Sequence, residues 1–298
     1  MTWEESKAAK ETYEKDLLSI EGVYAVGIGE STEEKGGYEI YIYTEKKQYA
    51  EKIVNTLDME APYRIWEGPA FQPDILYVKD LDALSSDEGR YRPMIGGIQL
   101  FLKDNTGAWL GTLGTFVKSK NNTDQGLYLL SNLHVLKSVG LAVCQPYYGN
   151  ENIIGVVTRA EDFPNTDAAL AMVNRTDDAA VNIIEGIGRV TEERNLGQED
   201  IGKRVIKRGR TTGLTEGTVE SIHATVNVDG TLRYDCVVVR ADSGKLFSNS
   251  GDSGSPVVLK EENKLVGLHF AGNKVLGGTS IFCKIENVFN NLDVKLPE

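Results

Sequence analysis

The pattern of hydrophobic and polar positions divides the chain into two parts of different character. Near the N-terminus, residues 3–19 and 46–57 mix apolar and charged positions in the manner of helices. Runs rich in β-branched and aromatic residues lie around these helices, as expected of strands, at 23–28, 38–43 and 63–66. Strands that alternate with helices predict a small α+β module at residues 1–79. We find no catalytic set of side chains in this module.

The pattern changes beyond residue 93. Short runs rich in β-branched and aromatic residues alternate there with clusters of Gly, Asn and Asp, which is typical of an all-β barrel or sandwich. These runs are residues 110–117, 127–131, 153–157, 217–228 and 236–240. Residues 80–92 are polar and end at Pro93, so they are the predicted linker. The sequence therefore predicts a module at 1–79, a linker at 80–92 and an all-β domain at 93–298.

Composition narrows the functional classes. The chain has 298 residues, of which 41% are hydrophobic and 26% charged, as in ordinary globular proteins. A net charge of -12 argues against nucleic acid or an anionic membrane as partner. The first 20 residues lack the apolar core of a secretion signal, so a cytoplasmic location is expected, with non-classical export left open. Three cysteines in apolar surroundings, Cys144, Cys236 and Cys283, are expected to be buried free thiols.

The strongest local motif is Gly-Asp-Ser-Gly-Ser-Pro at residues 251–256. A serine hydroxyl is a weak nucleophile that needs a neighbouring base and N–H groups aimed at the developing oxyanion. The glycines let the backbone turn so that the N–H groups of Gly251 and Ser253 can converge. Taken alone, the motif could equally be a hairpin turn, so its interpretation depends on a base and an acid elsewhere.

His134 and Asp167 supply candidates for the base and the acid. His134 follows the apolar run 128–133, and Asp167 leads directly into Ala-Ala-Leu. Each could be structural, as a packed histidine or a solvated carboxylate at a strand end. A buried carboxylate needs a partner, however, and an imidazole N–H is a suitable one. We therefore predict a triad of His134, Asp167 and Ser253, with the amides of Gly251 and Ser253 as the oxyanion hole.

Leu133-His134-Val135 and the motif at 251–256 resemble the His and Ser motifs of trypsin/chymotrypsin-like serine proteases. The order His, Asp, Ser separates the chain from subtilisins and α/β-hydrolases. The resemblance covers about residues 93–292 and is greatest to bacterial members without disulfides. It implies an all-β double six-stranded barrel with the active site between the barrels, preceded here by the small α+β domain.

The same resemblance implies a serine endopeptidase that acts on protein or peptide substrates without a cofactor or a metal. The alternative is a latent or inactive protease-like binding protein whose N-terminal module mediates the interaction. That module is also where a regulatory partner would bind.

Residues 208–213, Arg-Gly-Arg-Thr-Thr-Gly, are similar to a segment of α-lytic-type bacterial proteases that carries a buried arginine. The similarity implies that Arg210 pairs with Asp252 and supports the oxyanion loop. The alternative is that Arg210 is a surface charge.

Specificity is predicted from the pocket residues. Phe247 stands six residues before Ser253, where the trypsin pattern has the aspartate that selects Arg or Lys. Residues 266–272 resemble the pocket strand of glutamyl endopeptidases and viral chymotrypsin-like proteases. That likeness implies a pocket of Ser248, His269, Phe270 and Gly272 that prefers Glu or Gln, with the substrate adding as a strand along residues 270–272. The alternative for His269 is a packed strand residue.

Self-cleavage in the linker, for instance after Glu88, would suit this specificity.

The remaining motifs are weak. Residues 197–203 mimic a phosphate loop, but Arg204 stands where Ser or Thr would bind magnesium, and the run that follows is predicted to be a strand. His223 is predicted to lie on a strand face. The sequence shows no zinc-binding motif such as HExxH.

Overall fold

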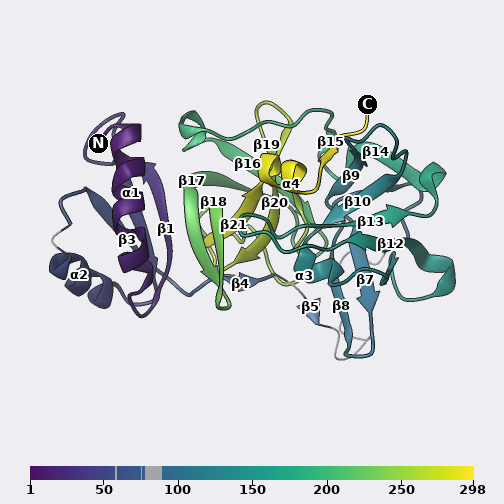
Figure 1. Ribbon diagram of the computed structural model, residues 1–298, viewed down its shortest axis with the longest axis horizontal. Helices are drawn as coiled ribbons and strands as arrows, with labels where there is room; N and C mark the ends of the chain where they lie inside the picture. Colours follow the sequence, from purple (N-terminus) through teal and green to yellow (C-terminus); the bar gives the residue numbers. More distant parts are fainter. Residues whose placement is uncertain (58, 75, 78–88) are drawn as a thin grey trace.

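A computed structural model describes residues 1–57, 59–74, 76–77 and 89–298 (Figure 1). Two β-barrels lie side by side, and an α+β layer flanks the second of them. Most of the predicted linker, including Glu88, lies outside the described residues. Among the described residues, no helix is long and apolar enough to cross a membrane.

The first barrel is formed by strands from the middle of the chain. Neighbouring strands follow the order β9-β10-β13-β12-β11-β7-β8. Its core contains Leu100, Phe116 and Leu129. The strands are β7 (Gln99–Lys103), β8 (Ala108–Thr112), β9 (Thr115–Ser119), β10 (Leu127–Ser131), β11 (Ala142–Cys144), β12 (Ile153–Arg159) and β13 (Ala169–Val173). A short helix, α3 (Leu133–Leu136), follows β10, and β22 (Val294–Lys295) pairs with β9.

The run at 110–117, predicted as one segment, is divided between β8 and β9. The break falls at Leu113 and Gly114, where the chain meets the loop that carries Ser253. A Cβ at Gly114 would lie 2.9 Å from the carbonyl oxygen of Gly254. Only a glycine allows the two backbones to come this close.

The second barrel has six strands and closes on itself. Its order is β16-β19-β20-β21-β18-β17, and β17 pairs again with β16. The strands are β16 (Arg204–Gly209), β17 (Gly213–Val228), β18 (Thr231–Ala241), β19 (Pro256–Leu259), β20 (Lys264–Gly272) and β21 (Thr279–Lys284). Helix α4 (Ile285–Asn291) follows β21. Cys236 and Cys283 face each other across β18 and β21, and all three cysteines are buried free thiols, as predicted.

The N-terminal elements also match the prediction: α1 (Trp3–Leu18), β1 (Val23–Glu30), β2 (Tyr38–Thr44), α2 (Lys47–Thr56) and β3 (Tyr63–Glu67). Strand β1 pairs with β17, so its sheet continues that of the second barrel. Val26 and Ile40 pack with Leu17 of α1, whereas Tyr43 joins the core of the barrel. Both faces of β1 and β2 are therefore covered, which explains why the sequence there is nearly continuously apolar.

Two short strands run from this layer across both barrels. Strand β4 (Gln72–Pro73) pairs antiparallel with β20, and β5 (Leu76–Tyr77) pairs antiparallel with β8 (Figure 1). A small separate sheet contains β6 (Met94–Gly96), β14 (Ala179–Ile184) and β15 (Gly188–Arg189). Residues 72–73 and 76–77 thus contact the second and the first barrel, respectively.

Candidate active site

The three predicted triad side chains lie in one chain of hydrogen bonds. His134 Nδ1 is 2.6 Å from Asp167 Oδ2, and His134 Nε2 is 2.7 Å from Ser253 Oγ. Asp167 also accepts a hydrogen bond from the His134 backbone N–H at 3.1 Å. This arrangement can orient an imidazole and let it take the proton from a serine hydroxyl.

Strand pairing brings the histidine and the acid together. Strands β10 and β13 are antiparallel neighbours in which Ser131 faces Ala169. Helix α3, which carries His134, starts just after β10, and Asp167 lies just before β13. The two side chains therefore meet at one end of the same strand pair. Asn132 adds a further link, because its side-chain amide donates to the Asp167 carbonyl oxygen at 2.6 Å.

Asp167 is held in its charged form. Burial alone would raise the pKa of this carboxyl group, but the charge and hydrogen bonds of His134, together with the charge of Arg233, outweigh it. The pKa of Asp167 therefore lies below its ordinary value. A carboxylate in this position can fix the tautomer of a histidine and stabilise the imidazolium that forms when the histidine accepts a proton.

The loop that carries Ser253 depends on glycines. Gly251 and Gly254 have φ angles of 102° and 94°, a region that L-residues with side chains rarely adopt. A Cβ at Gly254 would lie 2.2 Å from the carbonyl oxygen of Thr112. In this conformation the N–H groups of Gly251 and Ser253 donate to a single acceptor, the carbonyl oxygen of Asp74, at 2.6 and 3.1 Å. The two amides expected to form an oxyanion hole thus converge on one carbonyl.

Asp252 pairs with a different cation from the one expected. The structure places Lys207 Nζ 3.2 Å from Asp252 Oδ2, with both side chains fully buried. The prediction that Arg210 makes this ion pair is therefore wrong. In β16 buried and partly exposed positions alternate, which puts Val205 and Lys207 on the inner side, whereas Arg210 follows the end of the strand.

The two residues that follow Arg210 still support the loop that carries Ser253, because they contact Asp252. The backbone N–H of Thr211 and the hydroxyl of Thr212 donate to the Asp252 carboxylate at 2.8 and 2.7 Å. Burial would raise the pKa of Asp252, but Lys207 and these hydrogen bonds hold it below its ordinary value. Burial lowers the pKa of Lys207, and Asp252 offsets part of that effect.

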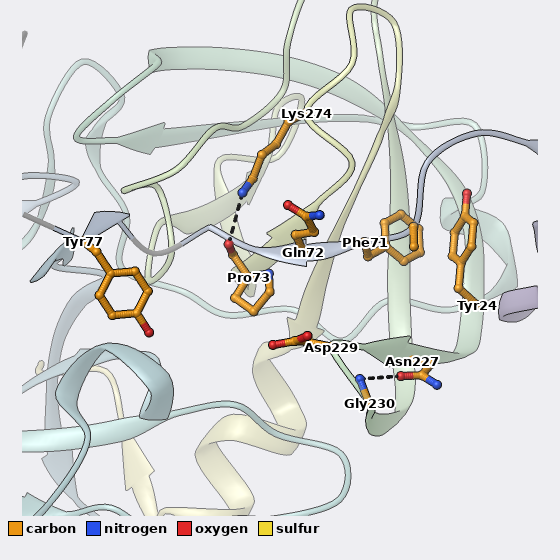
Figure 2. A pocket seen from close by; sticks show the side chains of 10 residues that line it. Tyr24, Phe71, Gln72, Pro73, Tyr77, Asn227, Asp229, Gly230 and Lys274 are labelled. Atoms are coloured by element: carbon orange, nitrogen blue, oxygen red, sulfur yellow. Dashed lines mark hydrogen bonds between the residues drawn. The ribbon is translucent and has the colours of Figure 1, made fainter. Parts of the chain in front are cut away.

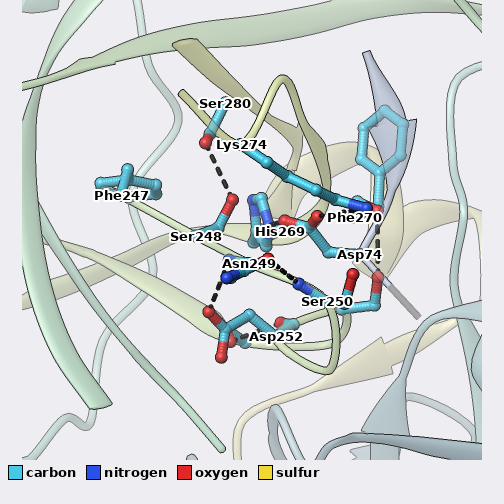
Figure 3. A network of polar contacts seen from close by, with 12 residues as sticks. Asp74, Phe247, Ser248, Asn249, Ser250, Asp252, His269, Phe270, Lys274 and Ser280 are labelled. Carbon is cyan, nitrogen blue, oxygen red and sulfur yellow. Dashed lines mark hydrogen bonds and ion pairs between the residues drawn. The ribbon is translucent and has the colours of Figure 1, made fainter. Parts of the chain in front are cut away.

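Figure 3 shows the side chain of Asp74 beside His269, with Ser248 nearby. A Cβ at Gly272 would lie 3.5 Å from Asp74 Oδ2, whereas the side chain of Phe270 belongs to the hydrophobic core. His269 Nε2 lies 2.8 Å from Asp74 Oδ2, and both side chains are fully buried. The ring of Phe247 meets that of His269 edge-on, with the centroids 6.1 Å apart. Ser248 Oγ is 2.9 Å from Ser280 Oγ, a residue that sequence reasoning missed because it lies on the neighbouring strand β21.

The main chain around Asp74 adds to β20 at the residues where a substrate strand was expected. The N–H of Asp74 donates to the Phe270 carbonyl oxygen at 3.1 Å, and Gln72 faces Gly272 in antiparallel register. Sequence reasoning missed Asp74 entirely. It belongs to no motif, and only the folded chain places it beside Ser253.

The third histidine lies elsewhere, on β17 as predicted. His223 Nδ1 is 2.6 Å from Asp235 Oδ1, which also accepts a hydrogen bond from Lys284 at 2.6 Å. Burial would raise the pKa of Asp235, but these partners lower it. In the described part of the chain, no group of three His, Cys, Asp or Glu side chains could hold a metal ion.

Because its pKa is lowered in the folded protein, Asp235 is expected to make the free energy of unfolding depend on pH in the acid range. A carboxyl group whose pKa is lower in the folded than in the unfolded protein stabilises the fold above its unfolded pKa of about 3.9, and this contribution is lost as the pH falls further. We expect the free energy of unfolding to fall below about pH 4, and to fall less steeply in Asp235→Asn. Denaturant unfolding between neutral and acid pH measures this slope. An unchanged slope in Asp235→Asn would contradict the assignment, and Asp177→Asn, which removes an exposed carboxylate, is the control.

Comparison with known proteins supports the architecture. A family model described as the Nal1 C-terminal domain matches residues 147–287. The structure is similar to Thermobifida fusca protease A, with 21% identity, a TM-score of 0.52 and coverage of 68% of this chain and 97% of that one. It is also similar to Nocardiopsis protease, with 20% identity, a TM-score of 0.52 and coverage of 68% and 98%. No curated protein sequence matches the chain.

A third structure is a glutamic acid specific serine protease described as using a novel histidine triad in substrate binding. It has 17% identity and a TM-score of 0.54, and the alignment covers 68% of this chain and all of that one. The fold is that of the chymotrypsin-like double-barrel proteases. At these identities the likeness establishes the fold, and the chemistry has to be argued from the site itself.

Proposed function

We propose that the protein is a serine endopeptidase that works through an acyl-enzyme. Asp167 orients His134, and His134 removes the proton from Ser253 as its Oγ attacks the substrate carbonyl carbon. The amides of Gly251 and Ser253 stabilise the oxyanion, and His134 then protonates the leaving amine. Water repeats these steps on the ester. The observation that carries the proposal is a carbonyl oxygen held by both amides beside a serine that is hydrogen-bonded to His134.

The proposed specificity is for an acidic or amide side chain before the scissile bond, Glu or Gln. A buried His269 whose Nε2 contacts a carboxylate supports the acidic member of this pair and extends the range to Asp. The glutamic acid specific neighbour, whose description places histidines in substrate binding, supports the same chemistry. A pocket of buried polar groups discriminates well, because a substrate that cannot pair leaves those groups unsatisfied.

Labelling with a fluorophosphonate tests the proposal, because the probe reacts only with an activated serine. Residue 74 occupies the site in the intact chain through both its carbonyl oxygen and its carboxylate. The Asp74→Ala variant keeps the carbonyl but loses the carboxylate contact to His269, so it is labelled beside the wild type. We expect mass spectrometry to place the adduct on Ser253. If Ser253 is unlabelled in both proteins, the protease assignment is wrong and the alternative, a latent or inactive binding protein, is favoured.

Replacing His269 tests the pocket. We expect His269→Ala to lower kcat/KM for a Glu-containing peptide by about 10- to 100-fold, the effect of one hydrogen bond to a charged group. His223→Ala is the matched control, because it removes a histidine that lies outside the pocket, and it should leave kcat/KM unchanged. Equal kcat/KM values in wild type and His269→Ala would rule out His269 as the residue that selects the substrate.

A further inference from the structure

The chain binds its own residues 72–74 in the site as a peptide substrate would bind. Three groups of contacts meet at Asp74. Its carbonyl oxygen accepts from Gly251 and Ser253, its N–H donates to Phe270, and its carboxylate lies 2.8 Å from His269 in the pocket. A main chain fixed on both sides of a carbonyl, with the side chain in the specificity pocket, is the arrangement required for attack on that carbonyl.

Anchors on either side of Asp74 hold the segment in this register. Before it, Phe71 is buried and packs edge-on against Tyr24, with ring centroids 4.8 Å apart. Lys274 Nζ donates to the Pro73 carbonyl oxygen at 3.3 Å (Figure 2). After Asp74, Leu76 faces Leu110 of β8 in the first barrel. The described residues of the segment therefore contact both barrels, and Asp74 lies between the two anchors.

Charge also favours Asp74 in this pocket. Besides His269, Lys274 Nζ lies 3.7 Å from Asp74 Oδ1. Among the described residues Asp74 Oδ1 has no hydrogen-bond partner, and the same is true of His269 Nδ1. Asp74 thus leaves part of the hydrogen-bonding capacity of the pocket unsatisfied. A side chain one methylene longer, that of Glu, would carry its carboxylate towards Ser248 and Ser280 (Figure 3).

We propose that the peptide bond between Asp74 and Ile75 is a substrate of this site in the same molecule, and that the uncut segment excludes other peptides from the cleft. This inference rests on the proposed serine endopeptidase function. Ser253 Oγ forms an ester with the Asp74 carbonyl carbon, the bond to the Ile75 nitrogen breaks, and the new amine takes the proton held by His134. Water then hydrolyses the ester, which leaves a carboxylate at Asp74 and restores the Ser253 hydroxyl. The products are residues 1–74 and 75–298, and one water is consumed.

Self-cleavage is tested on the full chain made in a cell-free reaction, so that the time course starts at synthesis. We expect intact mass and N-terminal sequencing to show a new chain that begins at Ile75, with a first-order rate constant that does not change on tenfold dilution. The Ser253→Ala chain should stay whole, and it should also stay whole when active wild type is added. An active wild type that stays whole, or a rate constant that falls with dilution, would overturn the proposal.

Exclusion of other peptides is tested in the uncleavable Ser253→Ala background. We expect Asp74→Ala to tighten the binding of a fluorescent Glu-containing peptide at least about tenfold, because the segment competes less well with the peptide once its carboxylate no longer contacts His269. Asp177→Ala, which removes an exposed carboxylate, should leave the Kd unchanged. Equal Kd values with and without Asp74 would overturn the exclusion.

The two proposals fail in different ways. If Ser253 reacts with the fluorophosphonate and added peptides are hydrolysed while the chain stays whole, only self-cleavage is wrong. If Ser253 is unreactive in the wild type and in Asp74→Ala, the endopeptidase assignment itself fails, and self-cleavage fails with it.

Discussion

Ser253→Ala is expected to lower kcat/KM on a Glu-containing peptide by at least about 10⁴-fold, because the nucleophile is lost and only the oxyanion hole and substrate binding remain. The Ser253 hydroxyl contacts His134 at 2.7 Å and the Phe270 carbonyl oxygen at 3.0 Å. Its loss removes hydrogen bonds without creating a large cavity, so the free energy of unfolding should change by only about 1 kcal/mol. Peptide hydrolysis and denaturant unfolding, measured on the same preparations, separate the two effects.

The control for this substitution is Ser19→Ala, at the C-terminal end of α1. Ser19 is exposed and contacts Asp16 within its own helix end, so its kcat/KM should equal that of the wild type. Hydrolysis at the wild-type rate by a cleanly purified Ser253→Ala protein would show that Ser253 is not the nucleophile. A loss of activity accompanied by unfolding would show instead that the hydroxyl holds the loop together.

Lys207→Met is expected to lower the free energy of unfolding by about 3–5 kcal/mol, the usual cost of leaving a buried charge without its partner. Lys207 and Asp252 are both fully buried, and their ion pair lies directly beneath the loop of Ser253. Methionine has a similar length but no charge, so the carboxylate of Asp252 loses its only ion-pair partner among the described residues. Because Asp252 also accepts hydrogen bonds from Thr211 and Thr212, we expect the loop that carries Ser253 to become less ordered as well.

The matched control is Lys245→Met. Lys245 lies 3.7 Å from Asp242, its side chain is 64% exposed, and ion pairs of this kind contribute less than about 1 kcal/mol. Denaturant unfolding measures both variants. Adding Asp252→Asn to Lys207→Met should recover part of the lost stability, since the uncompensated charge is removed. Equal stabilities of Lys207→Met and Lys245→Met would contradict the assigned role of the buried pair.

Local patterns in the sequence were enough to predict most strands and the three side chains of the proposed triad. The run 127–131, Leu-Tyr-Leu-Leu-Ser, was predicted correctly because a short apolar stretch between Gly126 and Asn132 is a local signal for a buried strand, and all five residues are buried in β10. Ser253 stands in a glycine-containing loop whose composition follows from the backbone shape that an oxyanion hole needs. His134 and Asp167 were found because only three histidines had to be considered and because each candidate borders an apolar strand.

The tertiary structure decided which side chains meet across distant segments. Both Lys207 and Arg210 could have paired with Asp252, and only the register of β16 puts the lysine on the inner side. Ser280 reaches Ser248 because β21 lies beside β20. Asp74 comes to Ser253 from 179 positions away, brought by a segment that carries no motif of its own. Pairing between strands depends on the closure of the whole barrel, whereas the patterns visible in a sequence extend over only a few residues.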